Sequence, residues 1–222
     1  MYKALIAVLV LFLAGCSWME RRGVEPHLDH IQIYRTPALN KAKEDIPVHP
    51  VEAQEQELSA VFFPFHVQER AGGNPNVGRK VGHVFWRTWL GQEVFDHMSY
   101  EDNPERPGRT KARELAQEQD ADLYVLGQVS RYMEGGSRGD TTIALLVNIY
   151  STETEELIWS MAHSGRMENR RDMDFVLIKR KTWMPESPEY VVVNNLAHDL
   201  AQTVKIWSRG EEGEIPSPSP DY

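Results

Sequence analysis

The chain lacks several features that would assign it to common classes of protein. It has a single cysteine, Cys16, in 222 residues, so no intramolecular disulfide can form. It also has no basic excess, because 33 acidic residues oppose 24 basic ones and the formal net charge is −9. Since nucleic-acid-binding domains carry a basic excess, we predict no nucleic-acid partner. After residues 4–13 no apolar run is long enough to span a bilayer as a helix.

The beginning of the chain has the pattern of an export signal. Lys3 precedes an unbroken apolar run at 4–13, which falls in the length range of a signal-peptide core. The run ends in the sequence LAGC at 13–16, which resembles the lipobox of bacterial lipoproteins. The resemblance implies that 1–15 is a signal peptide and that Cys16 is the first mature residue. It also implies that Cys16 carries diacylglycerol and an amide-linked acyl chain such as palmitate.

The lipobox resemblance also carries an expectation about location. Several acyl chains on Cys16 would give stable membrane attachment, whereas a single chain would be marginal. In the sorting rule of enteric bacteria, an aspartate after the lipidated cysteine retains the protein at the inner membrane. Ser17 stands at that place. We therefore expect the outer membrane, with the protein lipid-anchored on the periplasmic face.

A glycine-rich stretch, GGNPNVGRKVG at 72–82, raises the question of nucleotide binding. It lies between a strand-like and a helix-like segment, and Gly73 and Gly78 have the spacing of a phosphate-binding loop. Such a loop then needs lysine followed by serine or threonine, but Arg79 and Lys80 stand there. Because no hydroxyl is available for magnesium, we predict no nucleotide partner. Gly72, Gly73, Asn74 and Pro75 are interpreted as a turn, after which a helix begins at Asn76 or a neighbouring residue.

No set of residues in the sequence has the spacing of a catalytic or metal centre. There is no G-x-S-x-G motif, and no cysteine remains to serve as a nucleophile once Cys16 is lipidated. His27 and His30 lie in a presumed tether, and Glu101-Asp102 is interpreted as a solvated loop. Five other histidines fall on different predicted elements: His66, His83, His97, His163 and His198. We predict no catalytic residue, metal ion or cofactor. The alternative is a periplasmic lipid-anchored hydrolase with an unrecognised acid–base pair.

Composition divides the chain into four parts. After the signal peptide, 16–57 is rich in proline and charge and is predicted to be a flexible tether. Residues 58–208 show hydrophobic periodicity and are predicted to form one α/β domain. Residues 209–222 are acidic and rich in proline and serine, which predicts disorder.

The periodic region predicts elements in the order β-α-β-α-β-β-β-α. The two predicted helices before the last are 77–95 and about 110–119, and three strands between 121 and 167 form an antiparallel meander. In the final helix, from about 189, apolar residues recur at helical spacing: Val193, Leu196, Ala197, Leu200, Val204 and Trp207. The predicted fold class is α/β (α+β), a mixed sheet of about five strands with helices packed on it.

Two stretches of the domain resemble a known family. Residues 116–129, AQEQDADLYVLGQV, and 154–159, TEELIW, follow the pattern of the domain shared by the curli secretion lipoprotein CsgG, the amino-terminal domain of TolB, the synthase activator LpoB and the exopolysaccharide export lipoprotein PelC. Asp120 and Glu155 stand where that pattern has glycine. The resemblance implies a non-catalytic scaffold that binds envelope proteins or assembles into rings.

We therefore predict an outer-membrane lipoprotein that acts as a scaffold or accessory in envelope assembly or export. Its partners would be envelope proteins, including further copies of itself. Exopolysaccharide or fibre export and activation of a cell-wall synthase both fit. A curli-type pore subunit fits less well, because its added membrane-spanning hairpins are missing from the pattern.

The segment 168–188 is the predicted partner contact. It interrupts the path from the last strand to the final helix, where a shorter connection would suffice. It concentrates basic and aromatic side chains in an acidic chain, and such residues are frequent among interface hot spots. The residues concerned are Phe175, Lys179, Arg180, Lys181 and Trp183. The alternative is a structural connection whose apolar side joins the core and whose basic residues face water.

Overall fold

The computed structural model describes residues 31–35, 38–50, 52, 54, 56–68, 76–102, 107–135, 139–169, 173–174, 178–182 and 184–210. The predicted signal peptide, Cys16, Phe175, Trp183 and residues 211–222 of the predicted tail lie outside the described residues, whereas Arg209, predicted to belong to that tail, is the last residue of α4.

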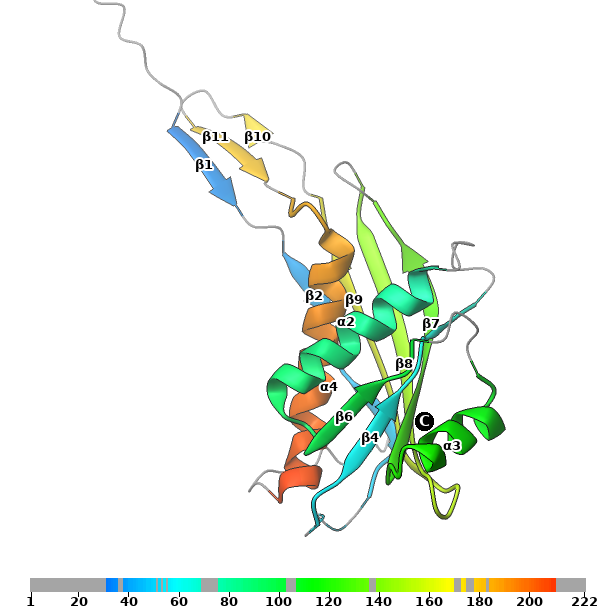
Figure 1. Cartoon of the computed structure of the whole chain (residues 1–222). Helices are drawn as coiled ribbons and strands as arrows, with labels where there is room; N and C mark the ends of the chain where they lie inside the picture. Colours follow the sequence, from blue (N-terminus) through cyan, green and yellow to red (C-terminus); the bar gives the residue numbers. More distant parts are fainter. Residues whose placement is uncertain are drawn as a thin grey trace, which may run out of the picture.

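Three helices and eleven strands make up the described part (Figure 1). The helices are α2 (Asn76–Gln92), α3 (Arg109–Glu118) and α4 (Pro188–Arg209). The strands are β1 (Ile31–Arg35), β2 (Leu39–Lys41), β3 (Asp45–Val48), β4 (Ser59–Phe62), β5 (His66–Val67), β6 (His97–Tyr100), β7 (Leu123–Met133), β8 (Thr141–Ser151), β9 (Leu157–Met167), β10 (Met173–Asp174) and β11 (Ile178–Thr182). None of the described helices is both long and apolar enough to cross a membrane.

The main sheet has eight strands in the order β2-β9-β8-β7-β4-β6, with β3 also paired to β9 and β5 to β7. Strands β7, β8 and β9 form an antiparallel meander, whereas β4 is parallel to both β6 and β7. Helices α2 and α4 cover one face of the sheet, and α3 lies on the other face (Figure 1).

The predicted fold class is confirmed. The predicted elements from β4 to α4 occur in the predicted order, but β5 is added after β4, and β10 and β11 are added before α4. The sheet has eight strands rather than about five, because β2, β3 and β5 are only two to four residues long. Alternation of apolar and polar residues cannot be recognised in segments that short. Two of these strands, β2 and β3, lie at 39–48, a stretch that composition assigns to the tether.

The larger core lies between the sheet and the pair α2 and α4. Strand β8 contributes Ile143, Leu145, Val147 and Ile149, and α4 contributes all six predicted apolar residues, each at most 2% exposed. On α2, Trp89 is buried in this core, whereas its neighbour Leu90 is 44% exposed. Trp89 Nε1 donates to the carbonyl oxygen of Ala197 at 2.9 Å, so the indole joins α2 to α4.

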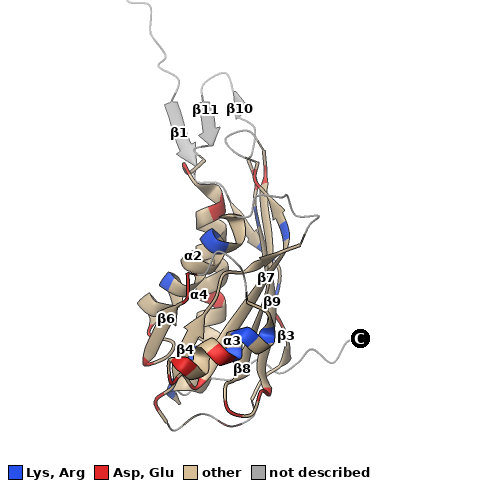
Figure 2. Cartoon of the chain, turned by 45° about the vertical axis from the view of Figure 1, so that its right-hand side comes forward, with Lys and Arg blue, Asp and Glu red and all other residues tan. Residues whose placement is uncertain are grey.

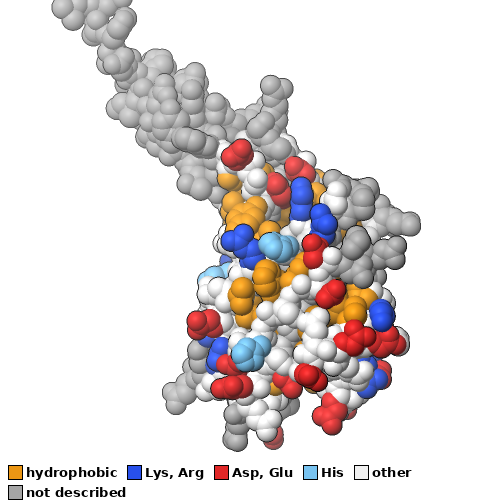
Figure 3. Space-filling view, viewed as in Figure 1, with side chains coloured by type: hydrophobic (Ala, Val, Ile, Leu, Met, Phe, Trp, Pro, Cys, Tyr) orange, Lys and Arg blue, Asp and Glu red, His pale blue; other side chains and the backbone are white. Residues whose placement is uncertain are grey.

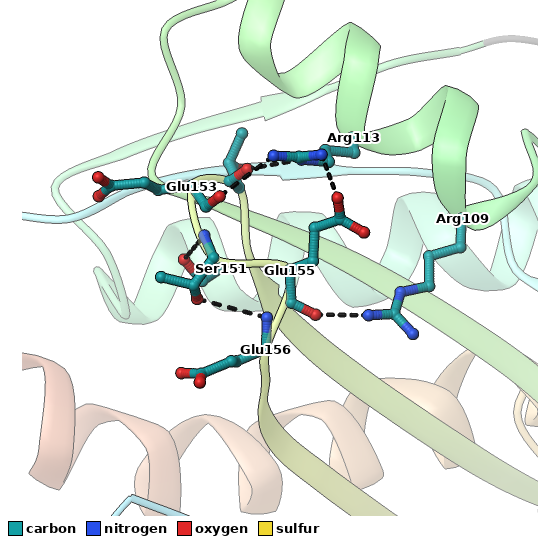
Figure 4. A network of polar contacts seen from close by, with 8 residues as sticks. Arg109, Arg113, Ser151, Glu153, Glu155 and Glu156 are labelled. Carbon is teal, nitrogen blue, oxygen red and sulfur yellow. Dashed lines mark hydrogen bonds and ion pairs between the residues drawn. The ribbon is translucent and has the colours of Figure 1, made fainter.

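A smaller core lies under α3, where Ala112 and Ala116 pack against Tyr124 and its neighbours on the sheet. Charged residues gather on α3 and on the turn between β8 and β9 (Figure 2). Arg113 Nε donates to the carbonyl oxygen of Thr152 at 2.9 Å, and its guanidinium pairs with the carboxylate of Glu155 (Figure 4). These contacts fix the turn against the helix.

The two positions that depart from the family pattern keep a backbone conformation that suits glycine. Asp120 has φ 52° and Glu155 has φ 63°. Both values lie in the left-handed region, which costs residues with a Cβ about 1–2 kcal/mol. The sequence therefore changes the side chains at these turns while the turn geometry of a glycine is retained.

A second sheet of three strands has the order β1-β11-β10. Strand β1 is parallel to β11, with Ile31 opposite Ile178 and Arg35 opposite Thr182. This sheet projects from the end of the domain at which α4 begins (Figure 1). The segment 168–188 thus contributes the central strand of a sheet that also includes part of the amino-terminal region.

Candidate binding groove

A groove of about 640 Å³ lies between the amino-terminal turns of α2 and α4 and the end of β7. Further along, the two helices are joined by the hydrogen bond from Trp89 to Ala197. Thr88 Oγ1 on α2 also lies 2.9 Å from Asn194 Oδ1 on α4. The groove is lined by Val77, Lys80, Val81, His83, Val84, Tyr132, Glu134, Pro185, Glu186, Ser187, Glu189, Tyr190, Val191 and Val193.

The floor of the groove is formed by valines whose spacing follows the helical repeat. Val77, Val81 and Val84 are at i, i+4 and i+7 on α2, so they share one side of that helix. Val191 and Val193 come from the second turn of α4. Because both helices direct apolar side chains here, the groove is apolar at its base.

Gly78 allows α2 to approach the sheet closely beside this floor. The amide of Phe65 donates to the carbonyl oxygen of Gly78 at 3.0 Å. A Cβ at position 78 would lie only 2.0 Å from the carbonyl oxygen of Phe65. In the glycine-rich stretch, Gly78 is therefore a packing residue inside α2. Lys80 lines the groove, and Arg79 pairs with Asp102 at 3.8 Å.

The rim of the groove carries opposite charges on its two sides. Lys80 is the cation on the α2 side, next to His83. The carboxylates of Glu134, Glu186 and Glu189 lie opposite, just after β7 and around the start of α4. The Tyr132 hydroxyl donates to Glu134 Oε2 at 3.2 Å. Burial raises the pKa of Tyr132, and the carboxylates of Glu134 and Glu189 raise it further. The hydroxyl therefore stays protonated and acts as a donor at the acidic side.

A large apolar side chain is exposed in the groove. Tyr190, in the lining, is 49% exposed. Figure 3 shows hydrophobic side chains gathered on this face with charged and histidine side chains around them. Exposed apolar patches with polar rims are typical of binding surfaces. The arrangement suits an apolar side chain flanked by charged groups.

An aromatic cluster continues this face along α2. The ring of His83 lies 5.4 Å from that of Trp86 and 5.5 Å from that of Tyr100. The Tyr100 hydroxyl donates to the carbonyl oxygen of Arg79 at 3.1 Å. Burial raises the pKa of Tyr100, and Asp102 adds to the shift. This cluster gives the α2 side of the groove a firm support.

The structure places part of the predicted contact segment at this groove. Pro185, Glu186 and Ser187, at the end of 168–188, belong to the lining. The backbones of Lys179, Arg180 and Lys181 lie in β11, just before it in the chain. Sequence reasoning missed the valine floor, because valines at helical spacing have the same pattern whether they face a core or a groove.

A separate polar cluster joins residues that the sequence keeps far apart. His163 Nε2 on β9 lies 3.0 Å from Asp199 Oδ2 on α4. Lys41 Nζ on β2 lies 2.5 Å from the same oxygen. Glu44 Oε2 accepts from Thr203 Oγ1 at 3.1 Å, next to the pair. No sequence signal brings His163 to a carboxylate, because its partners are on other elements.

The chain matches no protein-family model and no curated protein sequence. Among solved structures it is similar to a PelC dodecamer subunit from Paraburkholderia phytofirmans, with 15% identity over 78% of this chain and 98% of that chain and a TM-score of 0.47. A hypothetical protein from Chlamydia trachomatis has 9% identity over 68% of this chain and 98% of that chain, with a TM-score of 0.45. The LpoB carboxy-terminal domain from Salmonella enterica has 14% identity over 55% of this chain and 87% of that chain, with a TM-score of 0.35. Such distant likenesses assign no function, which has to be argued from the chain's own residues.

Proposed function

We propose that the chain is a lipid-anchored accessory protein of the bacterial envelope that holds a segment of a partner protein in the groove. The observation that carries the proposal is the valine floor of the groove with its charged rim. Apolar side chains gain free energy when they leave water for such a floor. The proposed action is therefore binding rather than catalysis, with no cofactor, nucleotide or nucleic acid required.

The rim favours a partner segment that bears basic residues next to an apolar one. Glu134, Glu186 and Glu189 line one side, against Lys80 and His83 on the other. A basic side chain would meet these carboxylates in charge-assisted hydrogen bonds, which are stronger than neutral ones. The proposed occupant is thus an extended or helical segment with an apolar residue flanked by lysine or arginine.

Cys16 supplies the proposed attachment. The LAGC sequence at 13–16 and Ser17 support lipidation and placement at the outer membrane, on its periplasmic face. Anchoring to the same membrane as the partner raises the effective concentration of the groove for that partner without any new contact. Exopolysaccharide or fibre export and activation of a cell-wall synthase are the two settings that the family resemblance supports. Self-association is the case in which the partner is a second copy.

Site-specific photocrosslinking in cells tests the groove. A photoreactive amino acid replaces Tyr190, which is 49% exposed in the groove, or Leu157, which is 37% exposed at the start of β9. Leu157 is a matched control, because it lies at the opposite end of the meander. We expect a discrete crosslinked partner from position 190 and none from 157. No adduct at 190, or the same adducts at both positions, would contradict the proposal.

A pair of substitutions on α2 separates loss of the groove from loss of the fold. Val84→Glu places a carboxylate on the valine floor and should abolish the crosslink from position 190. Leu90→Glu adds the same charge to the same helix at a site outside the lining, where Leu90 is 44% exposed. It should leave the crosslink intact. Circular dichroism of both variants checks that each is folded. Retention of the crosslink in a folded Val84→Glu protein would exclude the floor as the contact.

A further inference from the structure

Three potential metal ligands converge from three elements away from the groove. Glu44 lies between β2 and β3, His163 on β9 and Asp199 on α4. One ligand atom from each lies within 4.8 Å of the others. Among the described residues this is the one set of three such side chains so close together.

His163 is buried, and its imidazole ring faces this cluster. His163 is 4% exposed, and its Nε2 faces Asp199 Oδ2 at 3.0 Å. In the part of the chain that the structure describes, the buried Nδ1 of the same ring has no hydrogen-bond partner. The only polar contact of this buried imidazole is thus made by the nitrogen that faces the carboxylates.

The donor set matches zinc better than the other common divalent ions. One imidazole nitrogen and two carboxylate oxygens are ordinary zinc ligands, and a water molecule would complete tetrahedral coordination. Calcium takes six to eight oxygen ligands, and magnesium keeps several waters in octahedral geometry. A cluster of three ligands with a nitrogen among them suits neither.

Binding of a zinc ion would require only a local movement of the three ligand side chains. In a tetrahedral zinc site the ligand atoms lie about 3.4 Å apart, given bonds of about 2.0–2.2 Å. His163 Nε2 and Asp199 Oδ2 are already 3.0 Å apart, so closure depends mainly on Glu44. Glu44 lies in the connection between β2 and β3, and zinc binding would require its carboxylate to leave the Thr203 hydroxyl.

Lys41 provides a cation at the same place. Its ammonium lies 2.5 Å from Asp199 Oδ2, and its side chain is 34% exposed. An ion pair exposed to that extent contributes little, about 0–1 kcal/mol. The lysine can therefore turn into solvent and leave Asp199 to another cation. Lys41 would act as an internal competitor that sets the affinity of the site.

We propose that Glu44, His163 and Asp199 bind one zinc ion, which fastens the segment 39–48 to β9 and α4. The ion would connect two edge strands and the long helix through one point. Since β2 and β3 contact the sheet only through β9, such a link would stabilise the place where the amino-terminal region enters the domain. The proposal is independent of the groove.

Calorimetric titration of the metal-free full chain with zinc tests the site, with thermal unfolding measured in parallel. We expect one zinc per chain, and no comparable binding of calcium or magnesium. At zinc about 100-fold above Kd, the unfolding midpoint should rise by about 5–10 °C. Glu44→Gln and Asp199→Asn should each weaken binding at least tenfold. Lys41→Ala should tighten it, because the competing ammonium is removed.

His198→Ala is the matched control, because His198 is exposed and adjacent to Asp199 on α4. It should leave zinc affinity unchanged. Wild-type zinc affinity in Glu44→Gln and Asp199→Asn would show that the ion binds elsewhere and would overturn the proposal. Absence of zinc binding to both the wild type and Lys41→Ala would also overturn it. Circular dichroism of each variant confirms folding, so that lost binding is not lost structure.

Discussion

At the scale of single residues, Asp120 and Glu155 occupy turns whose backbone is left-handed. Glu155 gains contacts in return, since its carboxylate pairs with Arg113 and its carbonyl oxygen accepts from Arg109 at 2.5 Å (Figure 4). For Asp120 the structure gives only a backbone bond, from its amide to the carbonyl oxygen of Gln117 at 3.1 Å. Asp120 is therefore the position at which backbone strain is least offset.

Asp120→Gly should stabilise the domain by about 0.5–1 kcal/mol. Glycine removes the left-handed strain of about 1–2 kcal/mol, and the greater freedom of the unfolded chain returns part of that gain. Asp120→Ala deletes the same carboxylate but keeps a Cβ, so it should not stabilise. Urea unfolding of the three proteins measures the difference. Equal stabilisation by alanine and glycine would assign the effect to the side chain instead of the backbone.

At the scale of elements, the long periodic segments and the four-residue strands β4 and β6 could be predicted, whereas several other short strands could not. The three strands of the meander have eleven residues each, and α4 has 22, which gives the apolar repeat enough length to be recognised. Strands β10 and β11 have two and five residues. The partner of β11 is β1, near the other end of the chain, and no local pattern contains that pairing.

The same reason explains why the groove and the histidine cluster were not predicted. The groove is made by the ends of two helices and a strand that are separated by other elements. His163 and Asp199 are 36 residues apart, and Glu44 lies far before both of them in the sequence. Such contacts depend on how the elements pack, so they need the three-dimensional arrangement.

The basic strand β11 remains a proposed contact at this scale. Replacing Lys179, Arg180 and Lys181 with serine, or Trp183 with alanine, should reduce native crosslinks in cells. The loss should resemble the effect of added salt, because exposed charges are screened beyond about 8 Å at physiological ionic strength. A control replaces Arg87, Lys111 and Arg131, which are exposed elsewhere. Normal folding with every crosslink and full activity retained would make the segment only a connection.

At the scale of the whole molecule, the proposed anchor decides where the domain acts. Cys16→Ser should block lipidation and leave the precursor uncleaved or release the domain to the soluble fraction. The motivation is LAGC behind ten apolar residues at 4–13. Metabolic labelling with palmitate and membrane fractionation measure the outcome. Absence of palmitate label from the wild-type protein would contradict the lipoprotein proposal. The groove proposal would then be tested separately by crosslinking.

The attachment of β2 along β9 has a mechanical consequence. Leu39 pairs with Met167 and Lys41 with Gly165, and the amide of Ala42 continues the ladder to the carbonyl oxygen of Ser164 at 2.9 Å. Once β1 has separated from β11, a pull toward the amino terminus acts along the axis of β2, while β9 is held along its length by β8. The inter-strand hydrogen bonds are then loaded together in shear, so they must break at the same time and not one after another. A domain tethered by its amino-terminal side would in this way resist forces that separate the membrane from its partner, with a lifetime set by the rate of unfolding.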